Sequence, residues 1–163
     1  MSATIAIRPL TREAFAPFGD VLEAAGAPDR IINQGLCGRF HDRARLDFGG
    51  GQPGISLFKA NLRALPYRLD MLERHPLGSQ AFVPMCANGF LVIVAEDAGG
   101  QPAAPVAFRT APGQAINLLR NTWHGVLAPL AGSGIFAVID RIGEEANLEE
   151  HWLEIPATIV EAG

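Results

Sequence analysis

Glycine and proline divide this chain into short apolar runs, and this division constrains the fold more than any other feature of the sequence. The 163 residues include 18 Gly and 12 Pro, spread over the whole length. Turns are predicted at Gly49–Gly51, Asn88–Gly89, Gly99–Gly100 and Pro112–Gly113. Frequent turns between short apolar segments are typical of all-β domains, so we expect a sandwich or a small barrel, jelly roll included.

The predicted strands follow one another along nearly the whole chain. They are expected at Thr4–Arg8, Arg30–Gln34, Arg39–Phe48, Ile55–Ala60, Tyr67–Glu73, Gln80–Met85, Phe90–Ala95, Val106–Arg109, Ala115–Leu119, Gly125–Ala128, Ile135–Arg141 and Trp152–Ile155. Phe90–Ala95 and Ile135–Ile139 are continuously apolar and should be central strands. Thr11 is placed to cap one short helix, Thr11–Phe18, which Gly19 would end. No linker divides the chain, so residues 1–163 are expected to form a single domain.

Composition excludes several classes of protein. Hydrophobic residues make up 48% and charged residues 18%, which favours a folded core over disorder. The net charge is −4 with no basic stripe, which argues against nucleic-acid binding. The longest apolar stretch, Gly89–Ala95, is too short to cross a membrane, and the first residues do not have a signal-peptide pattern. Two scattered cysteines, Cys37 and Cys86, predict a cytoplasmic protein with reduced thiols.

The densest polar cluster is Glu73–Gln80, directly before an apolar strand. Glu73 and His75 share one face of a strand because side chains alternate with a period of two, whereas Arg74 points to the other face. Gln80 would face the pair from the next strand. A carboxylate, an imidazole and an amide would then surround one point; the alternative is a strand end whose charges are solvated.

Three further segments could carry chemistry. His124 follows the predicted turn Asn121–Thr122 and could be functional or an ordinary core or surface residue. Asp140 and Arg141 end an apolar strand and form either an ion pair at the rim or the wall of a site.

The third of these segments is Ile31–Asp42, which mixes polar and strand-like residues. Asn33 and Arg39 are its candidate binding residues, although the segment could equally be an exposed edge. Elsewhere the chain contains no phosphate loop, dinucleotide fingerprint, HExxH helix or nucleophile elbow. Nucleophilic acyl transfer is therefore disfavoured.

The Glu73–Gln80 cluster and the segment that contains His124 together resemble a degenerate pair of cupin motifs. Glu73, His75 and Gln80 occupy the positions of the first motif, and His124 that of the second. The resemblance implies a double-stranded β-helix barrel with these four residues as candidate metal ligands. Two imidazoles, a carboxylate and an amide oxygen suit a borderline divalent ion, Ni²⁺ first and Mn²⁺ or Zn²⁺ as alternatives; a site without metal stays open.

The sequences of four segments are more specific than the cupin motifs, and they resemble the ureidoglycolate lyase family, formerly called ureidoglycolate hydrolases. They are ERHPLGSQAFVPM at Glu73–Met85, NLLRNTWHGVL at Asn117–Leu127, IDR at Ile139–Arg141 and IINQGLCGRFHD at Ile31–Asp42. The opening Pro9–Glu23 is also similar, so the resemblance covers about Pro9 to Arg141, and the last 20 residues match little. It implies a homodimeric cupin-fold enzyme of allantoin degradation that releases glyoxylate and urea.

Cleavage of ureidoglycolate requires a base at the hydroxyl, help for the departing ureido group and a cation for the carboxylate. His75 or His124 could be the base, with Glu73 as a ligand or a proton acceptor. An arginine fork suits the carboxylate, in the order Arg141, Arg39, Arg74, and Lys59 is the next candidate.

Two other functions remain as alternatives at this point. A non-catalytic cupin that binds a small carboxylic acid would keep Arg39 and Arg141 and need no titrating histidine pair. A metal-dependent cupin oxygenase or epimerase would normally use three histidines and a glutamate, which the residues Glu73 and Gln80 do not match.

Overall fold

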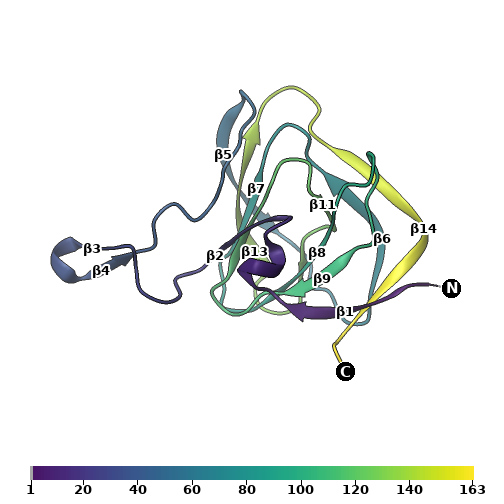
Figure 1. Ribbon diagram of the computed structural model, residues 1–163, viewed down its shortest axis with the longest axis horizontal. Coiled ribbons are helices and arrows are strands. Elements are labelled where there is room, and N and C mark those ends of the chain that lie inside the picture. Colours follow the sequence, from purple (N-terminus) through teal and green to yellow (C-terminus); the bar gives the residue numbers. More distant parts are fainter. Residues whose placement is uncertain (1) are drawn as a thin grey trace.

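Residues 2–163, which the computed structural model describes, form three β-sheets and one short α-helix (Figure 1). This confirms the all-β, cupin-like barrel expected from the sequence. The strands close around two apolar layers, and a small hairpin stands away from them at the left of Figure 1.

The largest sheet closes into a barrel. Its strands, in sheet order, are β11 (Trp123–His124), β6 (Tyr67–Arg74), β14 (Glu149–Val160), β1 (Thr4–Pro9), β9 (Val106–Arg109), β8 (Phe90–Ala95) and β12 (Ala128–Pro129). The ring closes because β11 pairs with β6 on one side and with β8 on the other. The barrel interior is apolar and includes Leu69, Ile93, Trp123 and Ile159. Closure gives each strand from β11 round to β8 a partner on both sides, whereas β12 pairs only with β8.

A second sheet packs on the outside of this barrel. Its order is β2 (Gly19–Leu22), β10 (Ala115–Leu118), β7 (Gln80–Pro84), β13 (Ile135–Ile142) and β5 (Gln52–Lys59). Phe82 and Val138 of this sheet pack with Val92 and Val94 of β8, so β8 is buried on both faces. This explains its continuous apolar run and confirms it as a central strand. β13 is central too, although its outer face is only half-buried.

The predicted helix is present but short. α1 (Arg12–Phe15) begins after Thr11, whose hydroxyl accepts a hydrogen bond from the Ala14 amide at 3.1 Å. It ends before Pro17, since a proline has no amide hydrogen to continue the helix. The helix buries Phe15 in the layer between the two sheets.

Two predicted strands are wrong. Only the first residue of Arg39–Phe48 is in a strand, because Asp42 has a left-handed φ of 48° and side chains bind the backbone amides along this segment. Gly125–Ala128 is replaced by β11 and β12, which pair with β8 on either side of an irregular segment. One extra residue between these pairings bends the chain out of register.

The carboxyl-terminal strand is longer than predicted from the sequence, and it completes the barrel. The expected strand Trp152–Ile155 is the middle of β14, a strand of twelve residues. β14 pairs antiparallel with β6 and parallel with β1, so it completes the barrel. β2 was likewise not predicted.

The third sheet is the isolated hairpin. β3 (Arg30–Ile32) and β4 (Cys37–Arg39) pair with each other around the tight helical turn η1 (Asn33–Gly35). Every residue from 30 to 39 is exposed. No helix within residues 2–163 has the length and apolar character needed to cross a bilayer.

Candidate functional site

Two histidines and a glutamate come together where β6 meets β11. His124 lies directly opposite Glu73 in the antiparallel register, so both side chains project from the same face. His75 lies two residues after Glu73 and projects the same way. One ligand atom from each of the three residues lies within 4.8 Å of the others, and the two imidazole centroids are 5.2 Å apart.

Hydrogen bonds orient both imidazoles with one nitrogen toward the site. His75 Nδ1 donates to the carbonyl oxygen of Asn147 at 2.7 Å, and His124 Nδ1 donates to the carbonyl oxygen of Gly125 at 3.0 Å. A carbonyl only accepts, so in each neutral ring the other nitrogen, Nε2, carries a free lone pair. Both Nε2 atoms are buried and have no partner within residues 2–163.

Burial determines the charge state of the group. It lowers the pKa of His124 to about 4, with a further contribution from the charge of His75, so His124 is neutral at physiological pH. Burial also raises the pKa of Glu73; the nearby His75 opposes this shift, and Glu150, its cross-strand neighbour, adds to it. Glu73 can therefore take up and release a proton closer to neutral pH than an ordinary glutamate.

This donor set fits a divalent metal ion. Two buried imidazole lone pairs without protein partners and a carboxylate are the ligand types that Zn²⁺, Ni²⁺ and Mn²⁺ accept. The carbonyl partners of Nδ1 have the arrangement that commonly orients histidine ligands.

Gln80 and Asp140 face the same layer from the second sheet. They are opposite each other in the register of β7 and β13, on the face that carries Phe82 and Val138. Gln80 Nε2 donates to Asp140 Oδ2 at 3.1 Å, and Gln80 Oε1 is buried without a partner within the described chain. The oxygen that was predicted as a metal ligand is thus still free.

The two arginines beside the site are engaged elsewhere. Arg74 points to the opposite face, as the alternation predicted: it bonds Glu149 and Asp97 and lies 4.4 Å above the Trp123 ring. Arg141 bonds Glu145 at 2.9 Å, and only 4% of its side chain is exposed. It alternates with Asp140 and therefore projects from the outer face of β13.

Three predicted binding residues are distant from this group in the same chain. Asn33 and Arg39 lie in the exposed hairpin. Lys59 is paired with Ile135, five residues along β13 from Asp140 and therefore roughly 17 Å away. Sequence reasoning missed Asn147, which acts through a backbone carbonyl that no side-chain pattern can reveal.

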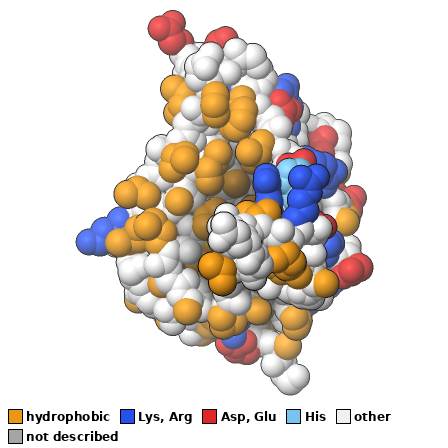
Figure 2. Space-filling view, turned by 90° about the vertical axis from the view of Figure 1, so that its left-hand side faces the viewer, with side chains coloured by type: hydrophobic (Ala, Val, Ile, Leu, Met, Phe, Trp, Pro, Cys, Tyr) orange, Lys and Arg blue, Asp and Glu red, His pale blue; other side chains and the backbone are white. Residues whose placement is uncertain are grey.

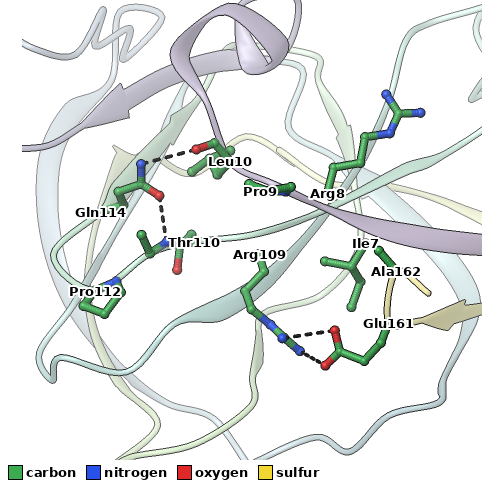
Figure 3. A pocket seen from close by; sticks show the side chains of 11 residues that line it. Ile7, Arg8, Pro9, Leu10, Arg109, Thr110, Pro112, Gln114, Glu161 and Ala162 are labelled. Carbon is green, nitrogen blue, oxygen red and sulfur yellow. Dashed lines mark hydrogen bonds and ion pairs between the residues drawn. The ribbon is translucent and has the colours of Figure 1, made fainter.

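The most apolar pocket lies elsewhere (Figure 3). It has a volume of about 440 Å³ and is formed by β1, the end of β9 and the carboxyl terminus. Two of its polar groups are already paired: Arg109 bonds Glu161 at 2.6 and 3.1 Å, and Gln114 bonds the Leu10 carbonyl and the Ala111 amide, while the remaining charged group, Arg8, is a guanidinium that does not titrate near neutral pH. It therefore offers no free acid–base group comparable to the histidine pair.

A cupin-like barrel with a potential metal-binding group on its strands is the class of protein that these observations define. Within that class the chain belongs to the ureidoglycolate lyase family, whose model matches residues 2–160. It is 61% identical over 154 residues to ureidoglycolate lyase of Rhodobacter capsulatus, covering 94% of this chain and 96% of the relative. It is 51% identical over 152 residues to ureidoglycolate lyase 2 of Rhizobium meliloti (92% and 93%), and 48% identical over 157 residues to that of Chelativorans sp. (95% of each). The match includes the carboxyl-terminal strand, which the motifs alone did not cover.

Proposed function

We propose that this protein cleaves ureidoglycolate to glyoxylate and urea, with Glu73, His75 and His124 as the catalytic group. The observation that carries the proposal is the pair of buried, unpartnered Nε2 atoms beside a carboxylate of raised pKa. The family match and the names of the relatives supply the substrate. A simple carboxylic-acid carrier would not need this group.

The reaction moves one proton and breaks one bond. The hydroxyl of the substrate loses its proton, its C–O bond becomes the aldehyde C=O, and the C–N bond breaks as the departing nitrogen gains a proton. Glu73 is suited to carry that proton, because its raised pKa lets it accept from the hydroxyl and donate to the nitrogen. His75 and His124 contact the hydroxyl through Nε2, and His75 is the better second acceptor because the lowered pKa of His124 makes it a weak base.

A divalent ion, Ni²⁺ first and Mn²⁺ or Zn²⁺ as alternatives, would be held by Glu73, His75 and His124, with the free oxygen of Gln80 as a further candidate ligand. Such an ion would make the substrate hydroxyl more acidic. Asp140 would then act through Gln80, whose amide it orients.

Several finer statements belong to the same proposal. The activity is a carbon–nitrogen lyase of the amidine-lyase type in allantoin and purine degradation, carried by residues 1–163 as a single domain. The two free thiols, Cys37 and Cys86, support a reducing cytoplasmic location. Exposed apolar side chains on β5 support a homodimer.

The test is a direct assay with racemic ureidoglycolate. Pure protein should release glyoxylate and urea in equal amounts, and the metal content of the same sample should be measured. Dialysis against a chelator followed by addition of Ni²⁺, Mn²⁺ or Zn²⁺ then shows which ion restores the rate. Binding of glyoxylate without any turnover would instead identify a carrier.

A further inference from the structure

We infer that the β3–β4 hairpin of one copy delivers Arg39 to the Glu73–His75–His124 site of a second copy, where it binds the substrate carboxylate. The inference rests on the proposed function for the identity of the ligand. It assigns a role to the Ile31–Asp42 motif, which the site within one chain leaves unused.

Within residues 2–163 the hairpin is held at its base, where the Asp29 amide donates to the Arg39 carbonyl, and its two strands are not part of the barrel or of the second sheet. β3 and β4 pair only with each other, and residues 30–39 are exposed without exception. Two-stranded hairpins are marginally stable in water unless they pack on another surface. The exposed fractions of Ile31 and Leu36, 61% and 87%, are those of apolar side chains that lack a partner surface. Arg39 lies at the base of the hairpin, opposite Arg30, and the segments before β3 and after β4 carry this base away from the barrel, at the left of Figure 1.

The surface that suits this hairpin lies on the same side of the molecule. Apolar side chains gather around a hollow on the face in Figure 2, which is the side from which the hairpin projects in Figure 1. Ile55 and Leu57 alternate with the inward Phe58 ring, point outward from β5, and are 75% and 68% exposed. Apolar patches on both the hairpin and β5 permit a twofold contact, in which each copy contributes both surfaces.

The site needs a cation that its own chain does not supply. A substrate with a carboxylate requires a fixed positive group, yet the arginines on adjacent elements are paired: Arg74 with Glu149 and Asp97, Arg120 with Asp47, and Arg141 with Glu145. A substrate carboxylate that binds one of these arginines would compete with the carboxylate that the arginine already holds. An unpaired arginine from a second copy would bind the carboxylate without displacing any of these partners.

Arg39 is a free cation in a position that calls for an anion. It has no ion-pair partner within residues 2–163 and lies directly opposite Arg30 in the hairpin register. Like charges directly opposite each other destabilise a strand pair, and a carboxylate between them would relieve this repulsion. Arginine also offers the planar fork that matches a carboxylate.

Subunit mixing tests whether Arg39 acts across copies. R39A and E73Q, each with a different affinity tag, should separately lose kcat/KM by at least about 30-fold. A purified mixed dimer has one subunit with an intact triad facing an intact hairpin, so it should recover about half of the wild-type kcat. A mixed dimer as inactive as its parents would place Arg39 in the site of its own chain and overturn the inference.

Controls separate folding and charge effects from delivery. R8A removes an exposed arginine on β1 and should keep wild-type activity, and a mixed R8A/E73Q dimer should show about half of it. R39K keeps the charge without the fork and should recover only part of the loss. Wild-type activity in R39A, with dimers intact by light scattering, would also overturn the inference.

A readout without turnover distinguishes failure of the inference from failure of the proposed function. A benzophenone attached to Cys37, which is two residues from Arg39 on the same face, should cross-link to residues 71–81 of an isotopically labelled second copy. Such cross-links in a protein without lyase activity would support the hairpin contact and refute the substrate. Cross-links confined to the same copy would refute the contact whatever the activity.

Discussion

At the scale of single residues, the site contains buried nitrogen atoms that have no hydrogen-bond partner within residues 2–163. The two Nε2 atoms are buried without partners, and Glu73 carries a pKa raised by burial. Leaving a buried polar group unpaired costs about 1–3 kcal/mol, so such groups are expected where a ligand completes them. The sequence predicted that Glu73 and His75 share a face, because this follows from the period of a strand. It could not predict that His124, 51 residues after Glu73, lies directly opposite Glu73 in the strand register.

The role of Glu73 is tested by the isosteric change E73Q. The variant keeps the shape of the side chain but cannot carry a proton, so kcat should fall by about 10²–10⁴-fold with a smaller change in KM. Glyoxylate release measures the rate. The matched control is E161Q, which breaks an exposed pair with Arg109 far from the site and should leave kcat unchanged. Equal kcat values for E73Q and wild type would remove Glu73 from the proton path.

Burial of His124 predicts a pH-dependent stability. Its pKa is about 4 in the folded, metal-free protein and near 6.5 unfolded, so between these values only the unfolded chain binds the proton. His124 therefore contributes stability that is present above pH 6.5 and lost as the pH falls to about 4, a loss of about 3 kcal/mol. The raised pKa of Glu73 works in the opposite direction, since its folded form binds a proton more readily.

The comparison with H124Q isolates this contribution. Urea denaturation of both chelator-treated proteins between pH 4 and 7 should show a steeper loss of stability in the wild type. Whatever stability the variant has at pH 7, the difference between the two curves should shrink as the pH falls. Parallel curves would mean that His124 is not held neutral by burial.

At the scale of elements, the sequence predicted those strands whose own residues show the pattern of a buried strand. β8 was predictable because both of its faces are buried and its six residues are all apolar. Residues 40–48 were not, because their path is fixed by distant groups such as Asp20, which accepts from the Arg45 amide at 2.7 Å, and Ser79, which accepts from the Asp47 amide at 2.7 Å. β14 was underestimated because its outward residues are charged, while its pairing with β1 joins the two ends of the chain.

The loop between β13 and β14 is predicted to position His75. Asn147 accepts from the Leu77 amide through Oδ1 and from His75 Nδ1 through its carbonyl, so one residue ties this loop to the β6–β7 turn. N147A should loosen the loop and weaken metal binding or turnover by about 10–100-fold. N61A, in an exposed loop, is the control and should change neither. If N147A lowers only the melting temperature and leaves the metal affinity unchanged, the residue is merely structural.

At the scale of the whole molecule, the side chains that stabilise the fold are different from those proposed to form the dimer interface. The barrel interior and the layer between the sheets contain the buried apolar side chains, whereas the outer face of β5 and the hairpin leave large apolar side chains in contact with solvent. An exposed apolar surface of this kind is typical of an interface. Composition alone indicated apolar surface, and the structure shows where it is exposed: on β5 and the hairpin, and also at Trp152 and Ile155 on β14.

A charge on the outer face of β5 should therefore break the assembly without unfolding the chain. In L57D an aspartate would replace a side chain that is 68% exposed and contributes to neither apolar layer, so the melting temperature of the isolated subunit should change little. Burying the new carboxylate in an interface without a partner would cost several kcal/mol, so light scattering should find monomers at micromolar concentration. Turnover should fall together with the fraction of dimer, since each site would lose the hairpin of the other copy.

The matched control is I155D on β14, where Ile155 is 60% exposed on the opposite part of the barrel; it should remain dimeric and active. A dimeric L57D, or a fully active monomer, would separate the β5 face from the function of the site.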